Sequence, residues 1–201
     1  MLPPCIPFRR FSSRDNRPGL AHFIQFYTFH CLPVLSQTGW FEYLSLSISK
    51  ACRAHSIAIW GYALLPNHVR LLVKPALETY CLKQFVACVK TDFQQTMLDA
   101  ASLPELKSLR VREKDGTRSY HFWQQGTGPV EAVASAATAH QKRDCCHGAA
   151  VELDLANIPE DWPWSSWHWT HGRRQLDPLP MQNWMESWKL DAAPRRAAMM
   201  Y

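Results

Sequence analysis

The order of periodic segments along this chain predicts an α+β fold, a ferredoxin-like β-α-β-β-α-β sandwich. Three observations predict it: a tight hairpin between two apolar runs, an amphipathic helical segment on each side of that hairpin, and strand-like segments at both ends of this block. A chain of 201 residues with 47% hydrophobic content is long enough for one such domain and its core. We expect an antiparallel sheet with helices on one face, followed by a helical, tryptophan-rich C-terminal extension.

The first half of the sandwich follows an irregular, proline-containing segment, residues 1–19. Residues 21–30 are rich in aromatic and β-forming side chains, which predicts the first strand. Residues 38–55 carry apolar side chains at helical spacing, which predicts the first helix. The apolar run 57–63 then enters a Pro-Asn turn and leaves as a second apolar run, so the second and third strands are predicted to form a hairpin.

The second half of the sandwich begins with residues 78–101, which fit a second helix with one apolar side. Residues 109–112 and 117–123 flank an Asp-Gly turn and complete the β-α-β-β-α-β order. The alanine-rich segment 131–143 is also predicted to be helical. We therefore divide the chain into a basic arm (1–19), a central domain (20–150) and the C-terminal extension (151–201).

The C-terminal extension is unusual for its tryptophans. Residues 161–171 contain four of them, and Trp184 and Trp188 have the i, i+4 spacing of a final helix. Two interpretations stay open: the extension is docked on the sheet, or its tryptophans stack on bases.

Composition sets limits on the partners and on the compartment. A net charge of +5 and a pI near 8.9 permit a nucleic-acid partner without requiring one. Four arginines between Arg9 and Arg17 make the start of the chain either a solvated tail or a phosphate-contacting arm. Seven cysteines without a C-x-x-C pair argue against a disulfide framework and for a reducing, cytoplasmic location. With no long apolar run or h-region, we expect a chain that is neither secreted nor membrane-spanning.

The hairpin contains the most informative residues. Strand alternation places His68, Arg70 and Leu72 on one face of the third strand. Packing explains an imidazole at the start of a core strand poorly, and a second histidine two residues later would converge with it on a divalent metal. Here that second position is Arg70.

Four landmarks, taken in order, resemble the single-tyrosine transposases with the HUH motif (His, bulky hydrophobe, His), in particular the REP-associated tyrosine transposases of the insertion-sequence-200-like group. Their hairpin commonly has the sequence Met-Pro-Asn-His-Val-His-Leu-Leu. The landmarks in this chain are Arg17-Pro18-Gly19-Leu20-Ala21-His22-Phe23, Leu65-Pro66-Asn67-His68-Val69-Arg70-Leu71-Leu72, Phe122-Trp123-Gln124-Gln125-Gly126 and Pro159-Glu160-Asp161-Trp162-Pro163-Trp164.

The resemblance implies a site and a reaction. In this family two histidines and a third polar ligand hold Mg²⁺ or Mn²⁺ against the scissile phosphate of single-stranded DNA. A tyrosine on a later helix attacks, and the resulting 5′-phosphotyrosine preserves the bond for rejoining. The resemblance thus implies DNA transposition, single-stranded or hairpin DNA as partner, a nucleoid-associated cytoplasmic location, and a monomer or homodimer.

The chain departs from the family pattern at both catalytic positions. His68 matches one metal ligand, but Arg70 stands at the other, and a guanidinium offers no lone pair to a metal. It would add positive charge beside the metal or bind phosphate directly. No tyrosine occurs between Tyr120 and Tyr201, and Ala139 falls at the expected nucleophile position. Tyr120 is the substitute candidate, ahead of Tyr80, so the sequence leaves open whether this chain is an enzyme.

The segment around that nucleophile position allows two further hypotheses. Cys145, Cys146 and His147, with His140, could bind zinc, although structural zinc sites favour two to four residues between cysteines. Alternatively, residues 130–150 are a translated frameshift, since the landmarks match on both sides of them. A nucleotide sequence that encodes a Tyr-Ile-His-like string in another frame would support this second hypothesis.

Three functions follow from these observations: a transposase that cleaves and rejoins single-stranded DNA, a non-catalytic remnant that binds single-stranded or hairpin DNA, and a protein that keeps only the fold. Scattered positive charge favours the first two. The candidate DNA-binding residues are Arg9, Arg10, Arg17, Arg70, Lys74, Lys83, Lys90, Arg110 and Arg112. We expect His68 and Arg70 to lie side by side on the open face of the sheet, facing the helix 131–143.

Overall fold

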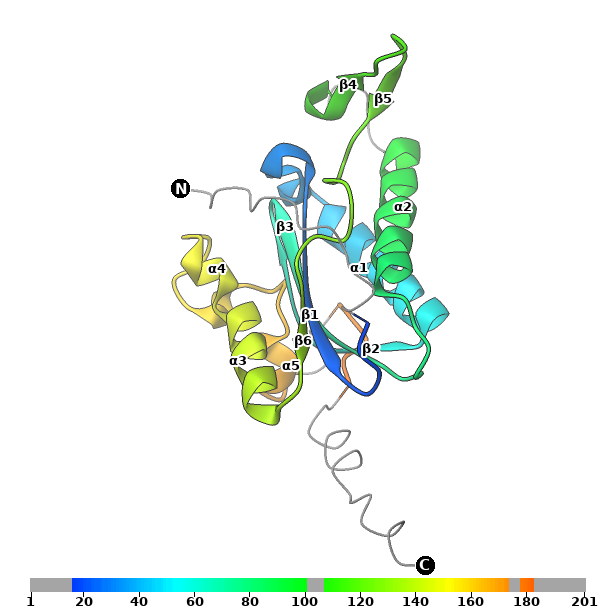
Figure 1. Cartoon of the computed structure of the whole chain (residues 1–201). Helices are drawn as coiled ribbons and strands as arrows, with labels where there is room; N and C mark the ends of the chain where they lie inside the picture. The colour runs from blue at the N-terminus through cyan, green and yellow to red at the C-terminus, as the bar shows by residue number, and fades with distance from the viewer. Residues whose placement is uncertain (1–15, 101–106, 174–177, 183–201) are drawn as a thin grey trace, which may run out of the picture.

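A four-stranded antiparallel sheet organises the molecule (Figure 1). The computed structural model describes residues 16–100, 107–173 and 178–182. The strands of this sheet are β1 (Ala21–Tyr27), β2 (Ile57–Leu65), β3 (His68–Pro75) and β6 (Val130–Val133), in the spatial order β2-β3-β1-β6. With α1 between β1 and β2, and α2 between β3 and β6, this order confirms the predicted ferredoxin-like sandwich.

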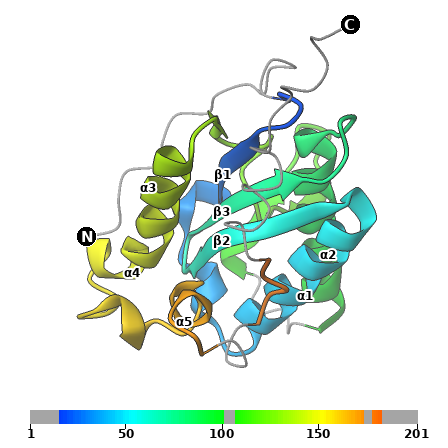
Figure 2. The same ribbon diagram turned by 90° about the horizontal axis from the view of Figure 1, so that it is seen from below.

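Two long helices, α1 (Trp40–His55) and α2 (Leu82–Ala100), cover one face of the sheet (Figures 1 and 2). Their apolar sides meet Ile24 and Phe26 of β1 and the odd-numbered side chains of β3 in the larger core cluster. Ser47 donates a hydrogen bond to Asp92 at 2.6 Å and joins the two helices at their outer edge. The predicted helices therefore exist, with slightly later starts than the sequence indicated.

The other face of the sheet is covered as well. Helices α3 (Ala136–His147) and α4 (Ala149–Glu152) lie on it, and their buried side chains form a second cluster with Phe23, Ala63 and Leu72 (Figure 2). Leu72 thus lies on the opposite side of β3 from Val69, as strand alternation predicted. The helix over this second face leaves no open face beside the hairpin.

A β-bulge in β2 lets α3 approach closely. Ile59 pairs with Val73 and Gly61 with Leu72, so Trp60 is the extra residue of the bulged strand. A Cβ atom on Gly61 would lie 3.6 Å from the Cα atom of Arg143, which shows how near the helix backbone comes. The bulge also shifts the alternation of β2, because Tyr62 joins the larger cluster and Ala63 the smaller one.

The last strand of the sheet is not where the sequence analysis placed it. Residues 109–112 and 117–123 contribute a separate two-stranded hairpin, β4 (Arg110–Arg112) and β5 (Arg118–Tyr120), which projects from the sandwich (Figure 1). The fourth strand is β6, which overlaps the start of the segment predicted as helix 131–143. That helix begins only at Ala136, where the Ser135 side chain accepts a hydrogen bond from the Thr138 N–H as its N-cap. Pairing with the free edge of β1 outweighs the helical preference of the preceding residues.

The C-terminal extension is docked on the edge of the sheet. The Trp164 carbonyl accepts a hydrogen bond from the Leu64 N–H at 2.8 Å, and the Ser166 and Gln182 N–H groups donate to β2 carbonyls at 3.0 Å. Trp162 and Trp164 pack against Phe41 of α1, and the extension includes the short helix α5 (Trp167–Thr170). For these tryptophans the docked interpretation is confirmed, while Trp184 and Trp188 lie outside the described residues. Docking covers an edge strand that would otherwise invite pairing with another chain.

Short 3₁₀ turns complete the description, at Phe29–Cys31, Val34–Ser36, Lys107–Leu109 and Pro159–Asp161. Cys31 is disulfide-bonded. Five other cysteines, Cys52, Cys81, Cys88, Cys145 and Cys146, are free thiols.

Among the helices in the described ranges, none has the length and apolar character needed to cross a membrane.

Candidate functional site

His68 begins β3 and is buried, with only 1% of its surface exposed. Its ring stacks on Tyr27 of the neighbouring strand, with ring centroids 5.2 Å apart and an interplanar angle of 20°. Its Nδ1 lies 2.8 Å from the Asn67 side-chain oxygen. An amide oxygen only accepts, so Nδ1 carries the proton and Nε2 presents its lone pair on the far side of the ring.

Arg70 donates a hydrogen bond to that lone pair. Its Nε–H donates to His68 Nε2 at 3.2 Å, and one terminal nitrogen donates to the Cys145 carbonyl at 2.8 Å and to the Glu152 carboxylate at 3.0 Å. The guanidinium therefore joins β3 to the end of α3 and to α4. The two hairpin residues do lie side by side and face this helix, as predicted, but both are covered: the Arg70 side chain keeps only 14% exposure.

The surroundings hold His68 in its neutral form. Burial is the main cause and the neighbouring positive charge of Arg70 the second, and together they lower the pKa of His68 to about 3. A neutral imidazole is the form that could bind a metal, yet its available nitrogen already accepts a hydrogen bond. A divalent cation here would also lie against a guanidinium. The donor set around His68 thus does not fit the Mg²⁺ or Mn²⁺ that the resemblance implied.

Helix α3, which covers the hairpin, contains no tyrosine. Ala139, at the expected nucleophile position, is fully buried in the second cluster. The contact with Arg70 comes instead from Cys145, about 9 Å further along the helix axis at 1.5 Å per residue. The expected nucleophile position therefore serves as a packing contact between helix and sheet.

Three tyrosines take other positions. Tyr120 is on the projecting hairpin, and Tyr80 bridges His22 Nε2 and the Arg17 carbonyl at 2.5 and 2.7 Å. Tyr27 of β1 is the tyrosine whose ring contacts His68. Its hydroxyl donates to Gln25 at 3.3 Å, and burial raises its pKa. A buried phenol with a raised pKa is a poor nucleophile.

The cysteine-histidine run at the end of α3 does not form a cluster of ligands. Cys146 is buried and its pKa is raised by burial, whereas His147 Nε2 lies 3.1 Å from the Ser166 hydroxyl. Across the described residues, no group of three His, Cys, Asp or Glu side chains is arranged to hold a metal ion. The zinc hypothesis finds no support in this arrangement.

Two of the candidate DNA-binding lysines donate hydrogen bonds to backbone carbonyls of the protein itself. Lys90 donates to the carbonyls of Gln124 and Gly126 at 2.8 and 2.6 Å, and burial lowers its pKa to about 8. Lys74 donates to the Gly19 carbonyl at 2.6 Å, with its Nζ 5.8 Å from the centre of the Trp60 ring. Both residues fix a loop against the sandwich.

The remaining candidate cations are exposed or lie outside the description. Arg17, Lys83, Arg110 and Arg112 have exposed side chains, the last two on the projecting hairpin. Arg9 and Arg10 lie outside the described residues. The exposed cations are therefore distributed over the start of β1, the outer side of α2 and the hairpin.

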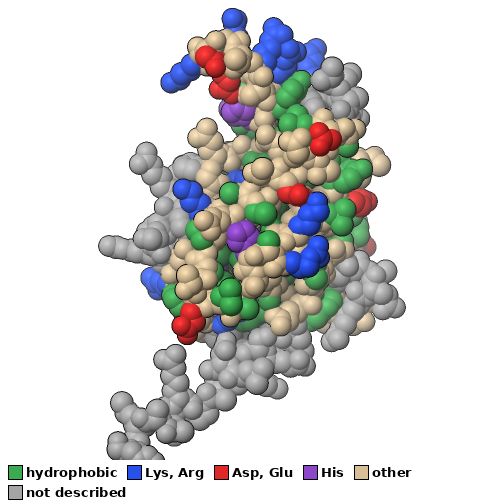
Figure 3. All heavy atoms as spheres, turned by 90° about the vertical axis from the view of Figure 1, so that its right-hand side faces the viewer, with side chains coloured by type: hydrophobic (Ala, Val, Ile, Leu, Met, Phe, Trp, Pro, Cys, Tyr) green, Lys and Arg blue, Asp and Glu red, His purple; other side chains and the backbone are tan. Residues whose placement is uncertain are grey.

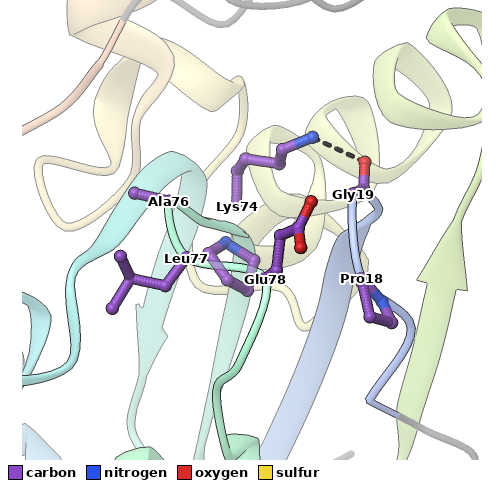
Figure 4. Close-up of a pocket in the computed structure, with 7 residues that line it drawn as sticks. Pro18, Gly19, Lys74, Ala76, Leu77 and Glu78 are labelled. Carbon is purple, nitrogen blue, oxygen red and sulfur yellow. Dashed lines mark hydrogen bonds between the residues drawn. The ribbon is translucent and has the colours of Figure 1, made fainter.

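A hollow of about 470 Å³ lies where β1 begins and β3 ends (Figure 4). It is lined by Pro18, Gly19, Lys74, Pro75, Ala76, Leu77 and Glu78. Its walls carry one cation and one carboxylate, and the Lys74 amine is turned to the Gly19 carbonyl. The hollow lies at the end of β3 remote from His68 and is separate from the hairpin site.

Together, the fold and the hairpin define a ferredoxin-like sandwich in which the Arg70 side chain occupies the Nε2 lone pair of His68. The solved structure of a REP-associated tyrosine transposase bound to a REP hairpin is similar, with a TM-score of 0.61, 15% identity, and coverage of 89% of this chain and 93% of that chain. At this identity the likeness shows that the two chains share a fold. A structure from Deinococcus radiodurans R1, described as a transposase, has 18% identity over 68% of this chain and 92% of that chain. Its TM-score is 0.44. No family model and no curated protein matches the chain.

Proposed function

We propose that this chain is a transposase-like DNA-binding protein that recognises hairpin or single-stranded DNA without cutting it through a phosphotyrosine intermediate. Two independent findings support the DNA partner. The fold matches, over 89% of the chain, a transposase whose solved structure holds a DNA hairpin. In addition, four sequence landmarks resemble the same family in the same order, which chance similarity of fold does not explain.

The proposed loss of cleavage is supported first by the Arg70 side chain. It takes the lone pair of His68 and is itself tied to Cys145 and Glu152. To bind a scissile phosphate, Arg70 would have to give up its ion pair with Glu152. The covering helix has Ala139 where the resembling family has its nucleophilic tyrosine. The chain therefore lacks both the second metal-binding histidine and the tyrosine that the ancestral reaction needs.

Incubation of the full chain with a hairpin-containing single strand and Mn²⁺ tests both parts of the proposal. We expect a retarded complex on a native gel, with affinity that falls steeply as salt rises, and no covalent protein–DNA species on a denaturing gel. A covalent species would contradict the proposed loss of cleavage, and Tyr120 would then be the first residue to substitute.

The competing function, a nucleic-acid-independent protein that keeps only the fold, makes the opposite prediction on the native gel. It requires the chain to bind neither hairpin nor single strand even at low salt. Such a result would overturn the proposed DNA-binding function as a whole.

A further inference from the structure

The projecting hairpin, which we call the basic ribbon (residues 107–120), concentrates positive charge. It carries five Lys or Arg residues and two carboxylates, whereas the net charge of the whole chain is only +5. In the space-filling view the Lys and Arg side chains gather at this end of the molecule (Figure 3). All five cations, Lys107, Arg110, Arg112, Lys114 and Arg118, have exposed side chains.

The register of the two strands places three arginines on one face. Arg112 pairs with Arg118, and Arg110 pairs with Tyr120. Residues directly opposite each other in an antiparallel pair project to the same side, and so do residues two apart on a strand. Arg110, Arg112 and Arg118 therefore share one face of the ribbon, the basic face.

Both nearby acidic groups are engaged away from the basic face, Glu113 on the other face and Asp115 in the turn. Glu113 accepts hydrogen bonds from Ser119 and lies 2.8 Å from His121 Nε2, and these contacts lower the pKa of its carboxyl group. Asp115 accepts from the N–H and hydroxyl of Thr117 at 2.9 and 2.6 Å in the turn. Within the described part of the chain, the three arginines of the basic face form no ion pair.

Like charges placed directly opposite on a ribbon are unfavourable by themselves. The Arg112–Arg118 pair thus destabilises the free ribbon, and a bound polyanion would reverse the effect. Guanidinium groups bind phosphate oxygens through two parallel N–H bonds, which suits a row of backbone phosphates.

The shape of the ribbon favours a duplex over a single strand. Proteins that bind single strands rely on exposed aromatic platforms for the bases. The aromatic side chain on the basic face, Tyr120, is half-buried and packs against the larger core cluster. A two-stranded ribbon, by contrast, is narrow enough to enter the major groove of DNA.

We propose that the basic ribbon is the surface that contacts the paired stem of a DNA hairpin, with Arg110, Arg112 and Arg118 on its phosphates. This inference rests on the proposed function and adds to it a place and a partner structure. The ribbon base is fixed by the His121 N–H, which donates to the Leu109 carbonyl at 2.9 Å, and by buried Phe122. The ribbon therefore holds its arginines at a set position outside the sandwich.

The test compares two full-length variants with the same loss of charge. One is Arg112→Gln/Arg118→Gln on the ribbon; the control is Lys50→Gln/Arg53→Gln on the exposed side of α1, which also removes the exposed ion pair of Lys50 with Asp92. The probes are a DNA hairpin with a fully paired stem and an unpaired oligonucleotide of the same base composition. We expect the ribbon variant to lose about tenfold in hairpin affinity and about 2 units of the salt slope, since each phosphate contact contributes about 0.9. Single-strand affinity should change less than about twofold, and the control should bind both probes as the unmodified chain does.

The other outcomes separate a failure of the ribbon assignment from a failure of the proposed function. If the unmodified chain binds the hairpin and the ribbon variant binds it equally well, the ribbon assignment is wrong while the proposed function stands. If the unmodified chain binds neither probe, both are overturned. The unmodified chain and the ribbon variant are also tested on phosphatidylserine vesicles. If the ribbon variant loses vesicle binding but keeps hairpin binding, the ribbon contacts an anionic membrane instead.

A charge-retaining variant guards against a folding artefact. Arg112→Lys/Arg118→Lys should keep most of the salt slope, because the charges remain, while losing some hairpin affinity with the paired N–H donors. Equal thermal unfolding midpoints in all variants would show that the ribbon is folded in each. A lysine variant as weak as the glutamine variant, with a lowered midpoint, would overturn the phosphate-contact role.

Discussion

Arg70 connects three elements through a single side chain. Its nitrogens donate to His68 on the same strand, to the carbonyl of Cys145 at the end of α3 and to Glu152 on α4. A guanidinium offers five donors in a fixed plane and keeps its charge at any physiological pH, so it can satisfy three acceptors at once. The same properties exclude it as a metal ligand. The residue that cannot ligate a metal thus also holds the covering helices on the sheet.

Replacing Arg70 by histidine should create a metal site that the present chain lacks. The lone pair of His68 becomes available, the new imidazole lies on the same face two residues later, and Glu152 loses its cationic partner. Two imidazoles and a carboxylate suit Mn²⁺ or Zn²⁺. We expect Arg70→His to be stabilised by millimolar Mn²⁺ in thermal unfolding, by about 2 to 3 kcal/mol if the metal concentration exceeds Kd about a hundredfold.

The double variant Arg70→His/His68→Ala is the control for that experiment and should lose the stabilisation. A midpoint unaffected by Mn²⁺ in Arg70→His would show that the residues cannot converge on one ion. Even with metal bound, Arg70→His should form no covalent DNA adduct. That step needs in addition a tyrosine on α3, near Ala139.

At the scale of elements, the loop before β6 decides how the sheet is completed. Lys90 of α2 binds the carbonyls of Gln124 and Gly126, and the Gln25 N–H donates to the Pro129 carbonyl at 3.0 Å. Between them Gly128 has φ +73°, and a Cβ atom there would lie 2.1 Å from the Gln25 carbonyl oxygen. This glycine permits both the left-handed backbone and the close approach of the loop to β1.

Gly128→Ala should therefore be among the most damaging small substitutions. The added methyl group must displace the backbone of β1, so we expect a loss of about 3 kcal/mol or more in the free energy of unfolding. Gly116→Ala is the matched control: its φ is +86°, but nothing lies within 4 Å of the added Cβ atom. It should cost only about 1 kcal/mol of backbone strain. Equal effects in urea unfolding would contradict the role given to the close contact.

At the scale of the whole molecule, two helical layers and the C-terminal extension are joined through buried polar groups. His147 at the end of α3 contacts the Ser166 hydroxyl, which also accepts from the Tyr62 N–H at 3.0 Å. One imidazole thus links the second helical layer, the extension and β2. Burial lowers the pKa of His147 to about 4, with the charge of Arg143 as the next cause.

This coupling predicts a loss of stability in acid. In the unfolded chain His147 takes up a proton near pH 6.5, but in the folded protein only near pH 4, so the contribution is complete above pH 6.5 and is lost as the pH falls toward 4. The shift corresponds to about 3 kcal/mol. We expect the free energy of unfolding to fall over this window, and His147→Gln to flatten the profile there. If the free energy of unfolding, measured with urea, falls with pH as steeply in His147→Gln as in the unmodified chain, His147 is not the source of the loss of stability.

The sequence by itself determined the β-α-β-β-α part of the order, the parity of the hairpin residues and the departure at Arg70, because these depend on local periodicity and on side-chain chemistry. It missed β6, since an alanine-rich segment favours a helix until the free edge of β1 is present to pair with it. Only the tertiary structure decided that Glu152 and Tyr27 lie at the hairpin site and that Lys74 and Lys90 bind protein carbonyls. Contacts between residues far apart in the chain have no periodic signal, so they become visible only when the sheet and its two helical layers assemble.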